Sequence, residues 1–469
     1  MAFLIGGANS AADGAAYEVA NSCRFNRADS AYMHKTPGGA GSTKIFTFSA
    51  WVKRGTIGSN QILLNAGEGD TTDDWLFYFH SGDTIKIFDF SNSGATTNIA
   101  VLTNQVFRDV SAWYHLVLAV DTSQGTAANR VKLYVNGTQV SSFATATYPD
   151  QNFVIDVNST DTHWIGRRGD DVDYFDGYMA EVCLIDGTQL AATSFGEFDS
   201  DSPTIWKPKD VSGLTFGTNG FYLDFEDSAN LGNDKNGGTD LTEVNLAAVD
   251  QASDSPTNNF ATLNPLEHSP NSIAFSEGNC VASGVSGNSG RFTTGTYAPS
   301  SGKWYCEIKV TVGGSYPIFG VVDSTSSLKA HGTYFVEADS GTSQSGFAAF
   351  SNADFYHDDS NSYGTWVTYA TDDIIGLALD MDASPPTITL LKNNGDSEAF
   401  STEVPNSGNY NFPALGLYYA SAIAECNFGG CPSFALTSAE ADANGYGAFE
   451  FAPPSGYLAM CSKNIAEEG

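Results

Sequence analysis

Short runs in which apolar and polar residues alternate recur along the chain. In "VKLYVNG" (131–137), Val131, Leu133 and Val135 alternate with Lys, Tyr and Asn, and an Asn-Gly pair closes the run. Alternation with period 2 predicts a half-buried strand, and Asn-Gly is the strongest short signal for a tight hairpin turn. A similar run, "TITLLKNNG" (387–395), follows far downstream. The chain is therefore predicted to form two distant hairpins of the same kind.

Strand-like segments separated by turn residues fill most of the sequence, and no long window has the helical period of 3.6. The first series contains "CRFNRADSAYMHK", "KIFTFSAWVKRG", "QILLNAG", "DWLFYFH", "TIKIFDF", "WYHLVLAVD" and "YFDGYMAEVCLIDG". The second contains "SIAFS", "GKWYCEIKV", "YPIFGVV", "SGFAAFS", "DIIGLALDMD" and "FPALGLYY". This regular spacing predicts an all-β chain of antiparallel sandwiches, or jelly rolls, with little helix.

The two series are separated by sequence dense in Asp, Asn, Gly and Pro. Examples are "LDFEDSANLGNDKNGGTDL" and "DQASDSPTNNFATLNP". Such sequence breaks regular structure and indicates a connector. We predict an N-terminal arm (1–16), a sandwich (17–200), a connector with short strands (201–269) and a second sandwich (270–469).

Composition and charge support this organisation and exclude some partners. The chain has 469 residues, 48 of them Gly, with 13% aromatic and 16% charged residues, a profile that suits short strands and tight turns. The formal net charge of −33 repels nucleic acid and anionic membranes, so we expect neither nucleic-acid binding nor membrane insertion. Residues 1–150 hold 10 basic and 12 acidic residues, against 11 and 42 in residues 151–469. The nearly neutral N-terminal part is therefore expected to pack against another protein.

Cysteine usage and the chain start indicate synthesis in a reducing cytoplasm. The seven cysteines include no CxxC pair, and some lie in apolar strand-like runs such as "EVCLI", so buried thiols are expected. No transmembrane run is found. The start, "MAFLIGGANSAADG", has no basic region and too short an apolar stretch for a signal peptide.

Each predicted sandwich resembles a known family. In the first, the blocks "FTFSAWVKRG" (46–55), "WYHLVLAVD" (113–121), "VKLYVNGTQV" (131–140) and "WIGRRGDDVDYFDGYMAEVCLIDGTQL" (164–190) resemble the laminin-G-like, pentraxin-like branch of concanavalin A-type lectins. In the second, "GKWYCEIKV" (302–310), "DDIIGLALDMDASPPTITLLKNNG" (372–395) and "FPALGLYY" (412–419) resemble a SPRY-type sandwich. The two hairpins are thus expected to belong to two unrelated β-sandwiches.

The whole chain, a lectin-like sandwich followed by an acidic connector and a SPRY-like sandwich, is similar to virion structural proteins of marine tailed bacteriophages. The resemblance implies a tail-fibre or tail-associated surface protein, made in the bacterial host cytoplasm and located in the virion. It implies other virion proteins, in the tail or capsid, as partners of the N-terminal part, a host-surface glycan or protein as ligand, and a homo-oligomer, with a trimer as one option.

We expect the protein not to be an enzyme. β-Glucanase relatives of the lectin fold carry Glu-x-Asp-x-x-Glu on one strand, whereas "EFDSDS" (197–202) has Ser202 in place of the second Glu. No HExxH or HxxxH zinc motif and no GxSxG nucleophile motif is present. The leading hypothesis is adhesion to the host surface. The alternatives are a capsid-decorating or head-fibre protein with a mechanical role and, more weakly, a depolymerase of envelope polysaccharide.

Two acidic segments are the candidate metal site. "GEGDTTDDW" contains Asp70, Asp73 and Asp74. "RRGDDVDYFDG" contains Asp170, Asp171, Asp173 and Asp176. The pentraxin-like resemblance implies that these loops meet at one rim and bind Ca²⁺, which takes six to eight oxygen ligands. Asp73, Asp74, Asp170, Asp171 and Asp173 are the predicted ligands. The alternative is that neighbouring arginines neutralise the rim without a metal.

Aromatic and basic residues beside these loops are the candidate ligand site. Sugar sites commonly combine an aromatic platform with polar side chains on loops. Trp75, Tyr174 and Phe175 are the predicted platform, with Arg167 and Arg168 as polar partners. The alternative is that these aromatic residues only fix the loops to the sandwich.

Overall fold

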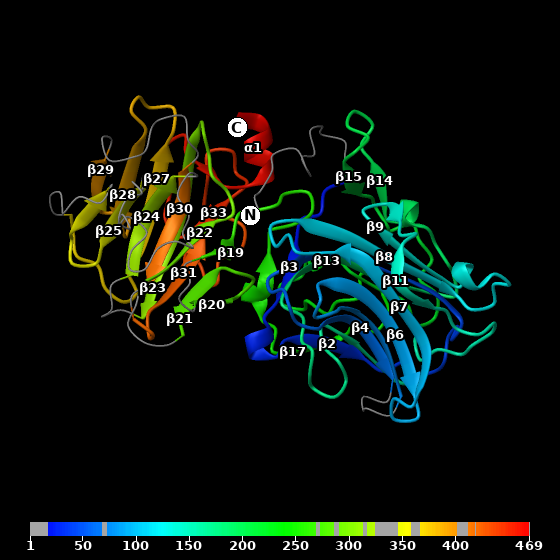
Figure 1. The fold of residues 1–469 in the computed structure, drawn as a ribbon. Coiled ribbons are helices and arrows are strands. Elements are labelled where there is room, and N and C mark those ends of the chain that lie inside the picture. The colour runs from blue at the N-terminus through cyan, green and yellow to red at the C-terminus, as the bar shows by residue number, and fades with distance from the viewer. Residues whose placement is uncertain are drawn as a thin grey trace. The chain divides into compact units, whose positions relative to one another are not determined.

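The computed structural model describes residues 17–67, 73–268, 273–285, 290–312, 317–323, 346–357, 366–400, 411–417 and 419–468. They form two compact units that meet in sequence between Thr257 and Asn258. We call residues 17–257 the first unit and residues 258–468 the second (Figure 1). Helix accounts for 5% and strand for 46% of the structure. The prediction of an all-β fold built from antiparallel sheets is confirmed.

The first unit contains two large antiparallel sheets. Sheet 1 has the order β10 (Thr138–Gln139), β9 (Val131–Val135), β8 (Trp113–Asp121), β3 (Ile45–Arg54), β13 (Gly177–Asp186), β1 (Ser22–Phe25) and β18 (Gln251–Ala252), and β16 (Phe221–Leu223) also pairs with β13. Sheet 2 has the order β11 (Phe143–Thr147), β7 (Thr96–Val106), β6 (Thr84–Ser91), β5 (Asp74–Phe79), β4 (Gln61–Gly67), β12 (Thr162–Ile165), β2 (Tyr32–Lys35) and β17 (Thr242–Val244).

Short elements complete the first unit. These are the hairpin of β14 (Gly196–Phe198) and β15 (Trp206–Pro208) and the 3-10 turns η1 (Arg27–Asp29), η2 (Ala127–Asn129), η3 (Ala192–Ser194) and η4 (Ala248–Asp250). The two sheets pack through their inner faces. Phe48 of sheet 1 meets Phe77 of sheet 2 edge to face, with ring centroids 5.9 Å apart. Apolar residues at alternate positions of both sheets thus form one core.

The Asn-Gly turn after β9 has the backbone that the sequence predicts. Asn136 and Gly137 have φ values of 46° and 78°, in the left-handed region that the tight hairpin requires. The Asn136 side chain also accepts a hydrogen bond from the backbone N–H of His115 (2.8 Å). In the second unit, Asn393 and Asn394 adopt the same region, with φ values of 49° and 57°.

The acidic segment after residue 200 is divided between the units, and its part up to Thr257 belongs to the first. Strands β16, β17 and β18 lie in it and pair with β13, β2 and β1. Ion pairs fasten it further. Asp250 is 3.1 Å from Arg24 of β1, and Asp254 is 2.6 Å from Lys53 of β3. Of the residues predicted as a connector (201–269), those up to Thr257 therefore extend the sheets of the first unit, and β19 (Leu263–His268) pairs in a sheet of the second.

The second unit also has two large antiparallel sheets. One has the order β19 (Leu263–His268), β22 (Arg291–Gly295), β30 (Asn411–Leu417), β24 (Pro317–Asp323), β25 (Gly346–Phe350) and β26 (Phe355–His357). The other has the order β20 (Ile273–Ser276), β21 (Val281–Gly284), β31 (Ile423–Asn427), β23 (Lys303–Val312), β27 (Ile374–Asp380), β28 (Thr387–Lys392) and β29 (Asp396–Phe400).

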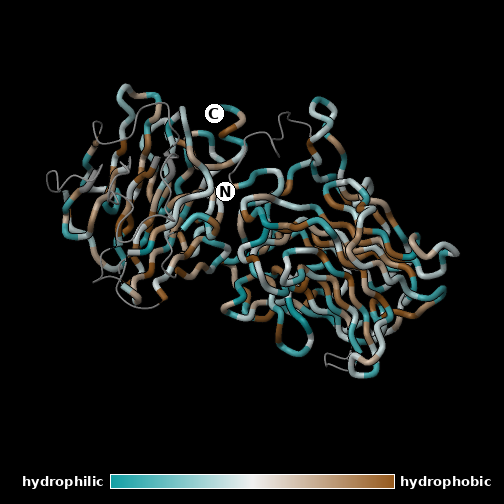
Figure 2. Tube along the Cα trace, in the orientation of Figure 1, coloured by the Kyte–Doolittle hydropathy of each residue, from teal (hydrophilic) through white to brown (hydrophobic). Residues whose placement is uncertain are grey.

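Short elements of the second unit lie near the end of the chain. They are β32 (Glu440–Ala441), β33 (Ala448–Phe449), β34 (Leu458–Ala459), which runs parallel to β23, and α1 (Ser462–Glu468). Trp304, Phe347 and Leu377 belong to the core of this unit. Figure 2 shows hydrophobic residues recurring along the strands of each unit and hydrophilic residues in several connecting loops.

All seven cysteines are buried, and none forms a disulfide. Across the described ranges, no helix has both the length and the apolar character to cross a membrane.

Candidate functional site

Strands β5 and β6 of sheet 2 carry apolar side chains on both faces. Trp75, Phe77 and Phe79 point into the core. On the opposite, outer face, Leu76 of β5 lies directly across from Phe88 of β6. The outer-face cluster is completed by the residues Ile62, Tyr78 and Phe90. Side chains alternate between the faces of a strand, so the five consecutive apolar residues 75–79 of β5 must present apolar groups on both sides.

A shallow cavity of about 330 Å³ lies over this outer face. It is lined by Asn60, Leu76, Tyr78, Phe88, Phe90, Gly94, Arg168 and Asp173. We call it the aromatic cavity. Its apolar side is formed by the rings of β5 and β6, and its polar side by one amide, one guanidinium and one carboxyl group. Two residues predicted for the site, Arg168 and Asp173, lie in it.

Arg168 is held in place at the edge of this cavity. Its Nε donates a hydrogen bond to Oδ2 of Asp74 (2.9 Å) and lies 3.6 Å from Oδ1 of Asp170. Its guanidinium also lies 5.5 Å from the centre of the Phe90 ring, within cation–π range. Asn65 donates to the other oxygen of Asp74 (2.7 Å). A group fixed in this way loses little conformational freedom when it binds a ligand.

The Asp74 carboxyl group is fully buried, and burial raises its pKa to about 6. Hydrogen bonds from Asn65 and Arg168 act in the opposite direction by stabilising the charged form. Burial likewise raises the pKa of Asp173. Arg168 therefore lowers the cost of burying the charged Asp74 carboxylate, but not enough to return the pKa of Asp74 to its usual value.

Arg167 points to a different place from Arg168. It forms an ion pair with Asp171, and its guanidinium lies 3.9 Å from the centre of the Tyr32 ring. The Tyr32 ring is in turn 6.3 Å from that of Tyr174. Arg167, Tyr32 and Tyr174 therefore form a local cluster, and neither Arg167 nor Tyr174 lines the aromatic cavity.

The predicted platform is wrong for two of its three rings. Trp75 and Phe175 have no exposed surface. Trp75 packs against Phe46 with centroids 5.4 Å apart, and Phe175 against Phe25 at 6.0 Å. A ring inside the core cannot stack on a sugar. The rings that line the aromatic cavity are instead Tyr78, Phe88 and Phe90. The signals that could have found them are the uninterrupted apolar run "WLFYF" (75–79) and the two Phe at alternate positions, 88 and 90.

The predicted calcium ligands do not converge on one point, and several of them pair with arginines. Asp74 and Asp170 lie at Arg168, Asp171 lies at Arg167, and Asp173 lines the aromatic cavity. Among the described residues, no group of three or more His, Cys, Asp or Glu side chains is placed to hold a metal ion. Asp70 lies outside the described residues. The geometry favours the alternative in which arginines neutralise the rim, and calcium binding stays a prediction.

Sequence reasoning missed two half- or fully buried carboxyl groups near this rim, Asp89 of β6 and Asp156. Burial raises the pKa of each to about 7, and repulsion from Asp73 and Asp74 adds to the effect. Asn98 donates a hydrogen bond to Asp89 (2.8 Å). Asp89 could have been found because it shares the inward face of β6 with Ile85 and Ile87, and it lies directly across from Trp75.

A buried Ser–His pair in sheet 1 has the wrong arrangement for catalysis. Ser49 Oγ is 2.9 Å from Nε2 of His115, and both residues are buried. The indole N–H of Trp206 donates to Nδ1 of His115 (2.9 Å). Nδ1 is thus an acceptor, so the neutral ring carries its proton on Nε2 and donates toward Ser49. Because burial lowers the pKa of His115 to about 3, the ring stays neutral and cannot accept the Ser49 proton through Nε2.

Comparisons with known proteins place the lectin likeness in the first unit. A laminin G-type family described as "Concanavalin A-like lectin/glucanases superfamily" matches residues 28–192, a little more than a third of the chain. No curated protein matches the sequence significantly. The family match confirms the lectin-like part of the predicted domain composition.

Three solved structures show weaker likenesses. The SPRY domain of human HERC1 is 15% identical, with 37% of this chain and 99% of that chain covered and a TM-score of 0.29. A native heptameric SAP-like pentraxin from Limulus polyphemus is 14% identical, with coverages of 38% and 80% and a TM-score of 0.28. A human SPRY domain is 20% identical, with coverages of 33% and 93% and a TM-score of 0.24. The SPRY assignment of the second unit stays a prediction.

Proposed function

We propose that this chain is a non-enzymatic surface protein of a tailed-bacteriophage virion, a tail fibre or tail-associated protein that attaches to the host surface. The observation that carries the adhesive role is the aromatic cavity, with Tyr78, Phe88 and Phe90 on one side and Asn60, Arg168 and Asp173 on the other. We propose a glycan as its ligand.

The chemistry of this cavity suits a saccharide. The apolar C–H face of a sugar ring packs on aromatic side chains, while its hydroxyl groups need donors and acceptors around them. Asn60 and Arg168 supply donors, and Asp173 and Asn60 supply acceptors. Arg168 is already fixed by Asp74, so its donors are oriented before a ligand arrives.

The same cavity argues against the depolymerase alternative. Glycoside hydrolysis generally requires two carboxyl groups flanking the scissile bond. Asp173 is the only carboxylic acid among the residues that line the aromatic cavity. A site with one carboxyl group can bind a sugar but lacks the second partner for the usual hydrolytic chemistry.

The virion context rests on the resemblance of the whole chain to virion structural proteins of tailed bacteriophages. We propose that the protein is made in the host cytoplasm and located in the virion. We further propose that it assembles as a homo-oligomer and contacts other virion proteins through the nearly neutral residues 1–150. The capsid-decorating or head-fibre role is the alternative. Particles that lack the protein should adsorb poorly to host cells under our proposal, whereas under the alternative they should adsorb normally and be mechanically fragile.

Binding of the purified full chain to host cells and to their isolated envelope glycans tests the adhesive role. Phe88→Ala removes a half-buried ring of the aromatic cavity and should weaken binding at least tenfold. Phe275→Ala is the matched control, because Phe275 is a half-buried phenylalanine on β20 of the second unit and does not line the cavity. Equal binding by both variants, at equal melting temperature, would exclude the aromatic cavity as the adhesive site.

A further inference from the structure

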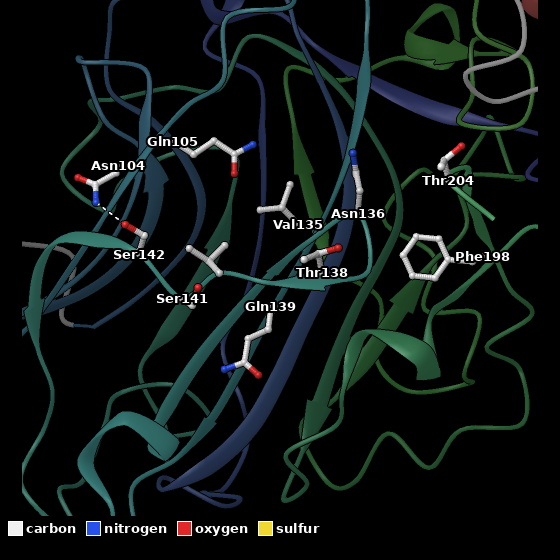
Figure 3. A pocket seen from close by; sticks show the side chains of 11 residues that line it. Asn104, Gln105, Val135, Asn136, Thr138, Gln139, Ser141, Ser142, Phe198 and Thr204 are labelled. Atoms are coloured by element: carbon white, nitrogen blue, oxygen red, sulfur yellow. Dashed lines mark hydrogen bonds between the residues drawn. The ribbon is translucent and has the colours of Figure 1, made fainter. Parts of the chain in front are cut away.

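A second cavity, which the sequence did not indicate, lies at one edge of the first unit (Figure 3). It has a volume of about 480 Å³. Its lining residues are Asn104, Gln105, Val135, Asn136, Thr138, Gln139, Val140, Ser141, Ser142, Phe198 and Thr204. We call it the edge pocket. The Asn-Gly turn after β9, the end of β7 and the β14–β15 hairpin meet around it, so three separate chain segments build it.

The edge pocket has no ionisable side chain, although the chain carries a net charge of −33. Its polar groups are amides and hydroxyls. Uncharged groups give no long-range attraction for phosphates, carboxylates or cations, and they do not repel a neutral molecule. The composition of the lining therefore indicates an uncharged ligand that is rich in hydrogen-bonding groups.

Several of these polar groups are available to a ligand. The side chains of Gln105, Gln139 and Ser141 are exposed and have no hydrogen-bond partner among the described residues. By contrast, Asn104 donates to Ser142 Oγ (2.8 Å), so this part of the lining is already fixed. Each amide offers two donors and one acceptor oxygen, the combination that sugar hydroxyl groups require.

An exposed aromatic ring forms the apolar side of the edge pocket. Phe198 is 45% exposed, and among the described residues it is the only aromatic one in the set of exposed large hydrophobic side chains. Its ring contacts Trp206 edge to face, with centroids 4.9 Å apart. Trp206 is itself fixed by its hydrogen bond to His115. Phe198 is thus supported from behind while part of its surface faces solvent.

We propose that the edge pocket binds an uncharged saccharide. Phe198 supplies the stacking surface, and the free amides of Gln105 and Gln139 bind hydroxyl groups. The inference deepens the proposed adhesive function, on which it rests for its biological role, by adding a second contact and naming its chemical class. Two weak sites on one unit raise the overall avidity for a polymer that can reach both.

The test uses the full chain and a panel of neutral gluco-, galacto- and manno-oligosaccharides, with their uronic-acid or sulfated counterparts beside them. Gln105→Glu and Gln139→Glu place a charge in the edge pocket without changing side-chain size. Thr147→Glu adds the same charge to an exposed position of β11 that does not line the edge pocket, and is the control. Titration calorimetry at millimolar ligand should show binding of a neutral oligosaccharide that each glutamate weakens at least tenfold and Thr147→Glu does not.

Each other outcome overturns the proposal. Failure of the whole neutral panel to bind wild-type protein, or binding that both glutamate variants retain, excludes the edge pocket as a saccharide site. Binding of an uncharged Ser/Thr octapeptide, or dimerisation of the chain through this edge, in place of sugar binding would assign the edge pocket to a protein partner. The Phe88→Ala variant separates the two sites, because it should leave binding in the edge pocket unchanged even if the adhesive role of the aromatic cavity is wrong.

Discussion

One fully buried carboxylate in each unit is stabilised in a different way. In the first unit, Asp254 is fully buried and lies 2.6 Å from Lys53, which is also buried. The indole N–H of Trp113 donates to its other oxygen (3.0 Å). In the second unit, Glu307 is equally buried, but its hydrogen-bond partners in the described residues are neutral. They are the backbone N–H groups of Glu450 and Phe451, each at 2.8 Å, with the Tyr305 hydroxyl and the Asn427 amide at 3.3 Å.

This difference shows how an acidic chain uses its few cations. With 21 basic residues against 54 acidic ones, most carboxylates cannot have a cationic partner of their own. In the first unit, buried cations join segments that are distant in sequence. Arg24 and Lys53, near its start, pair with Asp250 and Asp254, near its end. In the second unit, Glu307 is held instead by backbone N–H groups near the C-terminal end, which stabilise a carboxylate without a second charge.

Removing the cation from the first unit should have the largest effect. Lys53→Met leaves Asp254 buried without its charge partner, which typically costs 3–5 kcal/mol. Denaturant unfolding followed by tryptophan fluorescence should show this loss, and adding Asp254→Leu should recover most of it. Lys132→Met, on the less buried face of β9, should change stability by less than about 0.5 kcal/mol. A Lys53→Met protein as stable as wild type would remove the contrast between the units.

In the second unit, Glu307→Gln should cost about 1–3 kcal/mol at pH 8, because the new NH₂ group cannot accept the backbone N–H that one carboxylate oxygen accepted. The same unfolding experiment measures this loss. Glu398→Gln, on the exposed strand β29, is the control and should be nearly neutral. No loss for Glu307→Gln would mean that the carboxylate is not needed to hold residues 450 and 451.

A third experiment concerns Asp89 of the first unit, a buried carboxyl group that accepts a hydrogen bond from the neutral Asn98. The pKa of Asp89 is raised to about 7 in the folded protein, above the unfolded value of about 3.9, so folding favours its protonated form. Its stabilising contribution is present below about pH 4 and is lost as the pH rises through 7. Relative to wild type, Asp89→Asn should therefore gain about 1–3 kcal/mol of stability between pH 5 and pH 8.

Unfolding free energies at pH 5 and pH 8 measure this effect, with Asp150→Asn at an exposed position as the control. Equal pH dependence of the Asp89→Asn and wild-type proteins would show that the Asp89 carboxyl group is charged in the folded state at both pH values.

The smallest effect is expected from calcium. Because Arg167 and Arg168 already lie beside Asp171 and Asp74, calcium or EDTA should leave the melting temperature unchanged within about one degree. Differential scanning calorimetry checks this result. A rise of several degrees with calcium, abolished by Asp171→Asn, would instead establish the metal site that the lectin-like resemblance implies.

The fold was accessible from the sequence because strand alternation and turn residues are local signals. The same signals could not orient strands that are apolar on both sides. In "DWLFYF", period 2 separates Trp75, Phe77 and Phe79 from Leu76 and Tyr78, but it does not say which set faces the core. The pairing of β5 with β4 and β6 determines which set faces the core, and it places Trp75 inside.

The role of the acidic segment was hidden for a different reason. Asp250 and Asp254 are separated from Arg24 and Lys53 by about two hundred residues of sequence, and no local pattern reports such a pair. The Asp/Asn/Gly-rich composition predicted a connector, because it describes how the chain turns and not what it contacts. Likewise, the neutral lining of the edge pocket comes from three segments that only the folded sheets bring together.

Because every cysteine is buried, the rate at which its thiol is alkylated reports how often the surrounding structure opens. A thiol reacts through its thiolate, and burial raises the pKa of Cys461 to about 12 and that of Cys183 and Cys426 well above the usual value. An alkylating reagent should therefore modify the native protein only when the structure around a cysteine opens. Cys23 and Cys183 report on the first unit, and the other five cysteines on the second. Mass spectrometry of the labelled peptides would thus time the opening of each unit separately, without any introduced probe.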